Sequence, residues 1–388
     1  MRNKRLQQSQ NSRRKNTEKL RKNIAFPPQV FHIESIDSLG QGVAKQGDQV
    51  TFVAKTLPTE NVVAQIVKKK KGVSFAVLNK IETEAENRIN PECEHYAQCP
   101  GCHFLHTDYE SELLYKKQSL ERMIKKLAVD SSQIKVIPAL SRFGYRNRLQ
   151  LHYRQSQLGL VDGLNDRIVE IPRCRLIRDQ LNKSLNDLYE NRSWADTYKG
   201  DGHCEIYLKG DEVSTEWNST YAHGGFTQVF DEMNQQLCGS VNEYLAEPKI
   251  KTVLDLFAGN GNLSQQLVQQ NNVRRTMVDS AVSDGEIRSH NIDLLSEDAL
   301  KKFQAVSTES QFDAVLVDPP RKGFPALWEW VKNYKPRKLV YVSCNASTMV
   351  RDLLNLRTKV SMDKVELIDL FPSTYHFETI CFISFDHK

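Results

Sequence analysis

The pattern of apolar and polar positions divides the chain into regions with different predicted structures. Between residues 28 and 84, apolar and β-branched residues alternate with polar ones in the runs VFHIESID, QVTFVAKTL, NVVAQIVKKKK and VSFAVLNKIE. This two-residue period is typical of strands with one buried face. Glycines that suit turns punctuate the runs, namely Gly40, Gly42, Gly47 and Gly72. Short strands at this spacing predict a small, OB-like β-barrel.

The second region, residues 85–225, begins with a group of cysteines and continues with a helical stretch from about Tyr109 to Leu127. Further along, the segments YRNRLQLHYR, QLGLVDG and CEIYLKG have the composition of strands. We therefore expect a central, β-rich domain that carries the cysteines.

From residue 226 the pattern changes again. A helical segment, VFDEMNQQLCGSVNEYLA, precedes apolar runs such as VLDLF, AVLVD, LVYVS and ICFISF, which alternate with further helical segments. Continuous apolar runs of this kind are typical of strands buried on both faces in a mostly parallel α/β sheet. The chain is thus expected to comprise a tail (1–27), a barrel (28–84), a central domain (85–225) and an α/β domain (226–388).

Composition and charge add constraints. With 388 residues of which 39% are hydrophobic, the chain is long enough for more than one folded domain. It contains no run of about 18 apolar residues and no apolar signal core at its N-terminus, so we expect a cytoplasmic protein without a membrane span. Residues 1–23 carry a charge of +8 and leave −3 for the rest of the chain. Such a basic tail suits a polyanion, although a tail that only confers solubility is the alternative.

A glycine-rich turn marks the first candidate site. In VLDLFAGNGNLSQQL a buried strand ends near Asp255, and Gly259 and Gly261 allow the backbone to approach a ligand. A dinucleotide site would have a third glycine at position 264, where serine stands. Asp279, placed to end the next strand, can accept from two ribose hydroxyls, as in class I S-adenosylmethionine sites. A tight turn without a ligand is the alternative.

Three further residues stand beside predicted strands. Asp318, in VLVDPPRKG, closes an apolar strand. Cys344 follows the strand LVYVS, where α/β folds place reactive groups, and a helix N-terminus after it would lower the pKa of its thiol. Glu378 opens the last strand, where an apolar setting would raise its pKa and suit a base. A buried structural cysteine is the alternative for Cys344.

Together these motifs resemble the RNA uracil-C5 methyltransferases from about residue 28 to the C-terminus. The segments FTQVF, DLFAGNGN, DPPRKG, YVSCNASTMVRDL and HFETI occur in the order of that family. The resemblance implies a class I, Rossmann-like catalytic domain in which Cys344 is the nucleophile and Glu378 the base that removes the C5 proton. It also implies S-adenosylmethionine binding by Gln228, Phe257, Asn262, Asp279, Asp293 and Asp318.

The chemistry accounts for these residue types. Addition of a thiolate at C6 of uracil turns C5 into an enolate carbon that can accept a methyl group, and a base then removes the C5 proton so that the thiolate leaves. The target base must leave its stack to reach the thiol.

The cysteines at 93, 99 and 102 have the spacing C-x5-C-x2-C, and a fourth lies far downstream. Spacing alone leaves a zinc site and an iron–sulfur cluster equally open, since His95, His103 and His106 are close by. The resemblance favours a [4Fe-4S] cluster, because the ribosomal branch of the family carries one. Its ligands would be Cys93, Cys99, Cys102 and Cys174.

The resemblance also bears on the substrate. The segment DSLGQGVAK in the predicted barrel resembles the RNA-binding TRAM module. A TRAM module together with the cluster is most similar to the branch that methylates 23S rRNA, and we expect a monomer that binds this RNA through local basic patches such as Lys68–Lys71 and Arg142–Arg148. Methylation of transfer RNA or of another rRNA site is one alternative. A weakly active or non-catalytic ribosome assembly factor is another.

Three positions depart from the family pattern. Phe230 stands where asparagine is usual, and Ala346 stands where proline is usual. Only 14 residues separate Asp279 from Asp293, so the helix between the second and third strands is expected to be shortened or lost.

Overall fold

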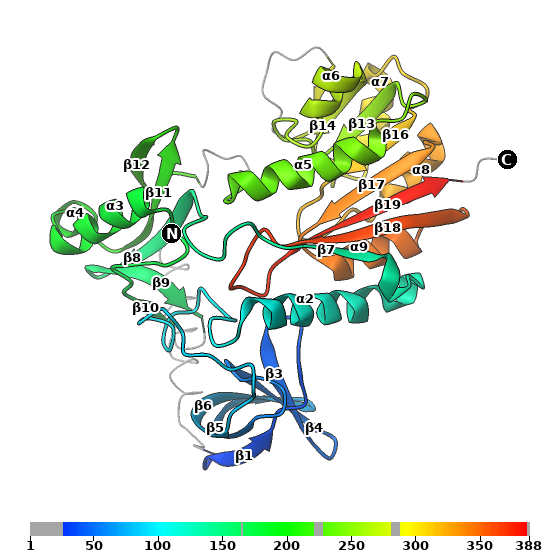
Figure 1. Ribbon diagram of the computed structural model, residues 1–388. Coiled ribbons are helices and arrows are strands. Elements are labelled where there is room, and N and C mark those ends of the chain that lie inside the picture. Colours follow the sequence, from blue (N-terminus) through cyan, green and yellow to red (C-terminus); the bar gives the residue numbers. More distant parts are fainter. Residues whose placement is uncertain (1–25, 164–165, 221–227, 281–287, 386–388) are drawn as a thin grey trace, which may run out of the picture. The chain divides into compact units, whose positions relative to one another are not determined.

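The computed structural model describes residues 26–163, 166–220, 228–280 and 288–385 (Figure 1). The predicted basic tail therefore lies almost wholly outside the described residues. The chain forms two compact units, an N-terminal unit that ends at Arg88 and a C-terminal unit of residues 89–388 to which residues 38–40 belong. None of the described helices has both the length and the apolar character needed to cross a membrane.

The N-terminal unit is a single curled sheet of six strands. In spatial order these are β1 (Gln29–His32), β5 (Asn61–Lys70), β6 (Val73–Thr83), β4 (Gln49–Ala54), β3 (Gln41–Gln46) and β2 (Ser35–Ile36). The two edge strands, β1 and β2, are consecutive in the chain, so one stretch of backbone closes the sheet at both edges. The N–H of Ile33 donates to the carbonyl of Glu60 (2.9 Å) and that of Glu34 to the carbonyl of Val43 (2.8 Å). The predicted small β domain is present, as a curled six-stranded sheet.

A buried carboxylate joins the end of this sheet to the chain that leaves it. Glu60 has no exposed surface and accepts from the backbone N–H groups of Leu57 (2.8 Å) and Ala85 (3.3 Å). It also pairs with the guanidinium of Arg88, whose Nη2 lies 2.9 Å from Oε2. Because a charge buried this deeply needs partners, Glu60 and Arg88 hold one another in place.

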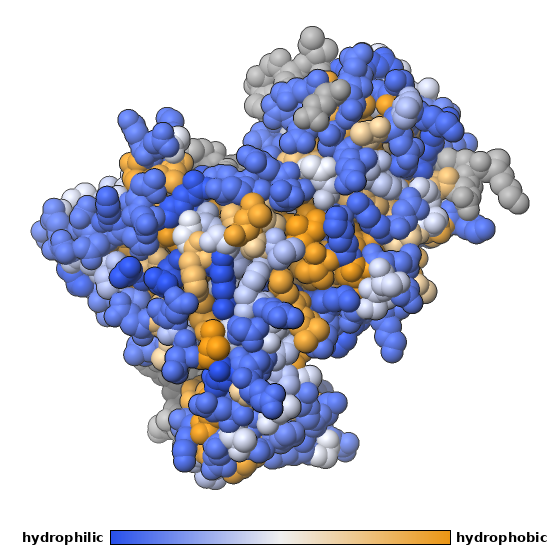
Figure 2. Space-filling model, viewed as in Figure 1, coloured by the Kyte–Doolittle hydropathy of each residue, from blue (hydrophilic) through white to orange (hydrophobic). Residues whose placement is uncertain are grey.

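The first part of the C-terminal unit has an antiparallel sheet of five strands. Their order is β10 (Arg167–Val169), β9 (Gln157–Asp162), β8 (Arg148–Arg154), β11 (Asp201–Lys209) and β12 (Glu212–Trp217). Helices α3 (Asp179–Glu190) and α4 (Trp194–Thr197) pack Leu181, Leu185 and Trp194 into its apolar core. The outer surface of these helices is mostly hydrophilic (Figure 2). This arrangement agrees with the predicted β-rich region.

The second part is an eight-stranded sheet that is mostly parallel (Figure 1). Its order is β15 (Ser289–Asn291), β14 (Arg274–Asp279), β13 (Thr252–Leu256), β16 (Ala314–Val317), β17 (Lys338–Ser343), β19 (Glu378–Phe385), β18 (Val360–Ile368) and β7 (Ile134–Ile137). Strand β19 runs antiparallel to both of its neighbours, while the other pairs are parallel. The predicted α/β class is confirmed.

Alternate residues of the central strands point to opposite faces, and helices cover both. Val253 and Leu316 contribute to a core with α5 (Asp231–Leu245) and α6 (Gln265–Asn271). Leu254 and Val315 contribute to a core with helices of the other face, which are α2 (Tyr109–Ile124), α7 (Ala299–Val306), α8 (Leu327–Tyr334) and α9 (Ala346–Leu354). Burial on both faces explains why these strands are apolar throughout.

Two elements before residue 226 belong to this second part. Helix α2 continues into a short 3₁₀ turn (Lys125–Leu127), as the helical pattern predicted, and a second 3₁₀ turn (Ser131–Gln133) leads into β7. Strand β7 pairs with β18 in parallel, with Val136 opposite Leu367. The domain boundaries at 84/85 and 225/226 remain predictions, and the sheet draws one of its strands from before the second boundary.

We expect Glu60→Gln to lower the free energy of unfolding of the N-terminal unit by about 2–3 kcal/mol, because it leaves the guanidinium of Arg88 without its buried partner. Hydrogen exchange of the β5 and β6 amides in the full-length protein measures this loss. Lys45→Gln is the control, since Lys45 pairs with Glu34 at 3.7 Å on the surface and contributes little. Equal protection in both variants would contradict the role of Glu60.

Candidate active site

The residues predicted to bind and react follow the carboxyl ends of neighbouring strands. Phe257 follows β13, Asp279 ends β14, Asp318 follows β16 and Cys344 follows β17. Since parallel strands end at the same edge of a sheet, these residues share one edge, where open α/β sheets bind ligands. The fifth, Glu378, is the first residue of β19, which starts at this edge because it runs the opposite way.

The glycine-rich turn after β13 has a strained backbone that its surroundings hold. Phe257, Gly259 and Gly261 all have positive φ, at 60°, 54° and 76°. A Cβ on Gly261 would lie 2.5 Å from the guanidinium of Arg275, so glycine is required there. The Ser264 hydroxyl donates to Asp255 (2.5 Å), and the Gly259 N–H donates to Asp279 (3.0 Å). The two strand-end acids therefore brace the turn from opposite sides.

The two amide side chains predicted to bind the cofactor, Asn262 and Gln228, differ in their hydrogen bonding. Asn262 and Asn234 of α5 exchange two hydrogen bonds, at 2.8 and 2.9 Å, so the turn is also tied to that helix. Gln228 is buried, and its Oε1 has no hydrogen-bond partner among the described residues. A buried acceptor without a partner costs free energy unless a ligand or water satisfies it. Phe226 and Thr227, which precede Gln228, lie outside the described residues.

The connection after β14 is short, and Asp293, which follows it, is exposed. Strand β15 pairs with β14 in parallel although only residues 280–288 connect them, which is shorter than the roughly dozen residues usual for such a crossover. Residues 281–287, where the shortened helix was expected, lie outside the described residues. Asp293 is exposed two residues after β15, and its side chain accepts from the N–H of Leu295 (3.0 Å).

Buried carboxyl groups gather behind the turn. Burial, followed by the charges of Asp255 and Asp279, raises the pKa of Asp318 to about 7. Burial likewise raises the pKa of Asp255 to about 7, against the hydrogen bond from Ser264. A site with this excess of carboxyl groups favours a ligand that carries positive charge or hydrogen-bond donors.

The pairing of β17 with β19 brings the predicted nucleophile and base together. Ser343 lies opposite Thr379 in this antiparallel ladder, so the next residues in each direction, Cys344 and Glu378, face one another. Glu378 is only 4% exposed, and burial and the charge of Asp318 raise its pKa well above the usual value. Burial, followed by the charge of Glu378, raises the pKa of Cys344 to about 11.

The helix that was expected to lower the pKa of Cys344 is present, but the net shift of this pKa is upward. Helix α9 does begin two residues after Cys344, with Asn345 as its N-cap accepting from the N–H of Ser347 (3.2 Å). Desolvation of the thiol outweighs any benefit from the helix, because the net shift is upward.

Arg321 is a functional residue that the sequence reasoning missed. Its positive charge lowers the pKa of both Cys344 and Glu378, and its side chain hydrogen-bonds the thiol. Its carbonyl accepts from the Asn345 amide (3.1 Å) and the Thr348 hydroxyl (3.3 Å), which fixes the DPPRKG segment on α9. A basic residue so close to Asp318 in the motif was the available signal.

The four cysteines of the predicted cluster lie near one another. The charges of Cys174, Cys99 and Cys93 each raise the pKa of Cys102, after the larger effect of its burial. Backbone N–H groups of Leu176 and Ile177 donate to Cys174. All four are free thiols, and within the described ranges no three metal-binding side chains converge in a geometry that would hold an ion.

Phe230 and Ala346, which differ from the family pattern, are both buried. The ring of Phe230 stacks on that of Tyr145 with centroids 4.7 Å apart, so an apolar contact replaces the expected polar one. Ala346 is buried at the start of α9.

Comparison with known proteins shows which enzymes this chain is similar to. Residues 296–385 match the family model described as tRNA (uracil-5-)-methyltransferase. The 23S rRNA (uracil(1939)-C(5))-methyltransferase of Shewanella sp. (strain MR-7) is 26% identical, over 91% of this chain and 94% of its own. The enzyme of the same description from Photorhabdus laumondii is 27% identical, over 90% and 95%.

Among solved structures, the tRNA (uracil-54, C5)-methyltransferase of Pyrococcus abyssi, in complex with S-adenosyl-L-homocysteine, superposes with a TM-score of 0.69. It is 20% identical, and the match covers 91% of this chain and 99% of that one. The likeness confirms a class I methyltransferase fold. Together with the relatives that span nearly the whole chain, it identifies the protein as an enzyme similar to the RNA uracil-C5 methyltransferases.

Proposed function

We propose that this enzyme uses S-adenosylmethionine to methylate C5 of a uridine in 23S rRNA. The observation that carries the proposal is the pairing of Cys344 with Glu378 at the sheet edge that also bears the glycine turn. A thiol and a carboxyl group on facing strands can act on adjacent carbons of one pyrimidine ring, as addition at C6 and proton removal at C5 require.

The residues proposed to hold the cofactor fit a cationic, nucleoside-bearing ligand. The free Oε1 of Gln228 and the carboxyl groups of Asp279, Asp293 and Asp318 offer acceptors, while Phe257 and Asn262 flank the turn. When bound, the cofactor would supply an electrophilic methyl group on a sulfonium. The excess of buried carboxyl groups supports binding of such a positively charged group.

Proton transfer sets the order of events at the reacting pair. At neutral pH the thiol of Cys344 is protonated, and it must give its proton to solvent before its sulfur bonds to C6 and moves the C5–C6 electron pair into an enolate. After C5 has taken the methyl group, Glu378 in its ionised form takes the C5 proton, and the C6–S bond breaks to release the thiolate. Arg321 favours both ionised forms, because its charge lowers the pKa of each group.

The proposed RNA contacts use the N-terminal unit, which we propose is a TRAM module. Lys68–Lys71 lie exposed where β5 turns into β6, and Lys69 lies over the ring of Phe26 at 4.2 Å. The rings of Phe52 and Phe75 stack near the same strands, 5.5 Å apart. Exposed lysines next to aromatic rings suit phosphate and base contacts.

Two arginines of the second predicted basic patch, Arg142–Arg148, are already paired with buried acids. Arg142 donates to the carboxylate of Glu112 (3.0 Å), and Arg148 donates to that of Glu205 (2.6 Å). Both arginines are largely buried and neutralised, so neither offers a free charge to RNA.

We also propose that Cys93, Cys99, Cys102 and Cys174 bind a [4Fe-4S] cluster with a structural role. The proximity of the four thiols and the N–H groups that face Cys174 support this, since thiolates require such donors. Their ligation would tie the segment of residues 93–102 to the start of α3.

Genetic complementation tests the reaction, the substrate and the nucleophile together. In a strain that lacks this gene, one uridine of 23S rRNA should lose its C5 methyl group. The wild-type gene should restore it and Cys344→Ala should not, because the covalent step is lost. Cys204→Ala, which removes a buried thiol of the central sheet, is the matched control and should restore it. A missing methyl group in tRNA instead, or restoration by Cys344→Ala, would contradict the proposal.

The ionisation of Cys344 has its own test. Because its pKa is about 11, the rate of its alkylation by iodoacetamide should rise about tenfold per pH unit from pH 7 to 10. Glu378→Gln should move the curve to lower pH, since it removes a negative charge beside the thiol. Mass spectrometry of the Cys344 peptide gives the rates, and an unchanged curve in the variant would show that the two groups do not interact.

The cluster proposal predicts a brown protein after anaerobic purification, with about four iron and four sulfide per chain by chemical analysis. Cys174→Ser should lose both the colour and the iron, whereas Cys238→Ser should keep them. A colourless protein with one zinc per chain would overturn the assignment in favour of the other metal that the spacing allowed.

A further inference from the structure

A buried network of charges lies outside the reacting groups and centres on Lys116 of α2. The ammonium group donates to Glu112 (2.8 Å), to Asp369 (2.8 Å) and to the carbonyl of Phe371 (3.3 Å). The side chain of Lys116 is 1% exposed, and those of both acids are wholly buried. Burial alone would lower the pKa of Lys116, but Asp369 and Glu112 outweigh it and keep the group charged.

Stability alone does not explain why these charges are here. Apolar residues of similar size commonly replace a buried ion cluster at no cost, because they avoid desolvation. What apolar residues could not do is bind backbone groups at defined points. The three hydrogens of the Lys116 ammonium group are all used, and one of them ends on a main-chain carbonyl.

The backbone that the network holds is the turn from Phe371 to Ser373. The N–H of Ser373 donates to Glu112 (2.6 Å), and its carbonyl accepts from the N–H groups of His103 (2.8 Å) and Phe104 (3.2 Å). The Tyr145 hydroxyl donates to the carbonyl of Pro372 (3.1 Å). Ser373 has φ of 68°, a left-handed conformation that is unfavourable for serine and persists only where the surroundings impose it.

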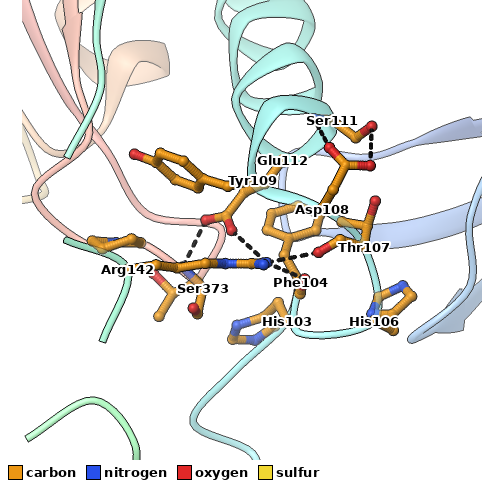
Figure 3. Close-up of polar contacts among 12 residues, drawn as sticks. His103, Phe104, His106, Thr107, Asp108, Tyr109, Ser111, Glu112, Arg142 and Ser373 are labelled. Atoms are coloured by element: carbon orange, nitrogen blue, oxygen red, sulfur yellow. Dashed lines mark hydrogen bonds and ion pairs between the residues drawn. The ribbon is translucent and has the colours of Figure 1, made fainter. Parts of the chain in front are cut away.

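A second set of contacts ties the same acids to the segment before α2. Arg142 donates to Glu112 (3.0 Å) and also to the carbonyls of Phe104 (2.6 Å) and Thr107 (2.9 Å), as Figure 3 shows. The Tyr109 hydroxyl donates to the second oxygen of Asp369 (2.9 Å). Each acid is thus fixed through both of its oxygens, and the network can move only as a whole.

The turn leads into residues that border the active site. Tyr375 and His376 are half-buried, and their rings lie 4.0 Å apart. His376 lies near Arg321, the same residue that contacts Cys344, and burial together with this charge and that of Lys116 lowers the pKa of His376 to about 4. The position of Glu378 is set independently, since it pairs with Ile368 in the sheet.

We propose that the Lys116–Glu112–Asp369 network is a positioning device that holds the turn so that Tyr375 and His376 form a fixed wall for the target pyrimidine. Its members are positioning residues and touch neither the cofactor-binding turn nor Cys344. The network thus acts on the capture of the base and leaves cofactor affinity unchanged. This inference rests on the proposed uracil-C5 chemistry.

The test separates base capture from cofactor binding. An RNA fragment that carries 5-fluorouridine at the target position traps the enzyme, because after methyl transfer C5 bears fluorine in place of the proton that a base removes. We expect Lys116→Met to form this covalent adduct at least tenfold more slowly than wild type. Its dissociation constant for S-adenosyl-L-homocysteine, measured by calorimetry, should stay within twofold of the wild-type value.

Lys338→Met is the matched control. Lys338 is also buried, at the far end of β17, where it donates to Glu247 (2.5 Å) and to the carbonyl of Tyr244 (3.1 Å). A loss of stability without a change in adduct rate is expected for it. If Lys116→Met does not fold, Arg142→Gln replaces it, since it removes one contact to Glu112 and leaves both ion pairs of Lys116 in place. Its loss should slow the adduct about threefold or more.

The outcomes are distinct. Equal adduct rates in Lys116→Met and Lys338→Met would overturn the inference, as would a parallel loss of cofactor affinity. Failure of the wild-type enzyme to form any adduct would instead overturn the proposed reaction.

Discussion

The antiparallel pairing of β19 with β17 is the constraint on which the active site depends. In an all-parallel sheet the residue after β17 would have no strand beginning beside it at the same edge. Because β19 runs the other way, its first residue, Glu378, lies opposite the first residue beyond β17, Cys344. The six residue pairs of the β17–β19 ladder would have to rearrange to separate the two, so their distance is a property of the sheet rather than of a loop.

Burial of this pair creates a chemical cost that the neighbouring charges reduce. A thiol with a pKa near 11 and a carboxyl group with a raised pKa are both neutral at physiological pH, yet the proposed reaction requires each of them to ionise. Arg321, in the segment between β16 and α8, is placed to favour both charges in turn. Desolvation also strengthens these interactions, since water does not screen them.

The sequence predicts much of this fold, and its failures have identifiable causes. The apolar runs around Asp255, Asp318 and Cys344 reveal their strands, because parallel strands are buried on both faces. The short strand β7 is not evident from its four residues, since it exists only through pairing with β18 more than 200 positions later. The arginines at 142 and 148 look like a basic patch because their partners, Glu112 and Glu205, are distant in the chain. The helix after Cys344 suggested a reactive thiolate, but only the structure shows that the thiol is half-buried beside Glu378.

The placement of β7 also bears on how the central sheet is attached. The chain leaves the catalytic sheet after β7, builds the five-stranded sheet and returns through α5. The five-stranded sheet is therefore an insertion into the catalytic fold, which the chain connects to that fold at both of its ends. A domain with one tether can swing about it, whereas two anchors suppress most rotation. If RNA binds to the insertion, these two connections would limit how far the bound RNA can move relative to the edge of the eight-stranded sheet that bears Cys344 and Glu378.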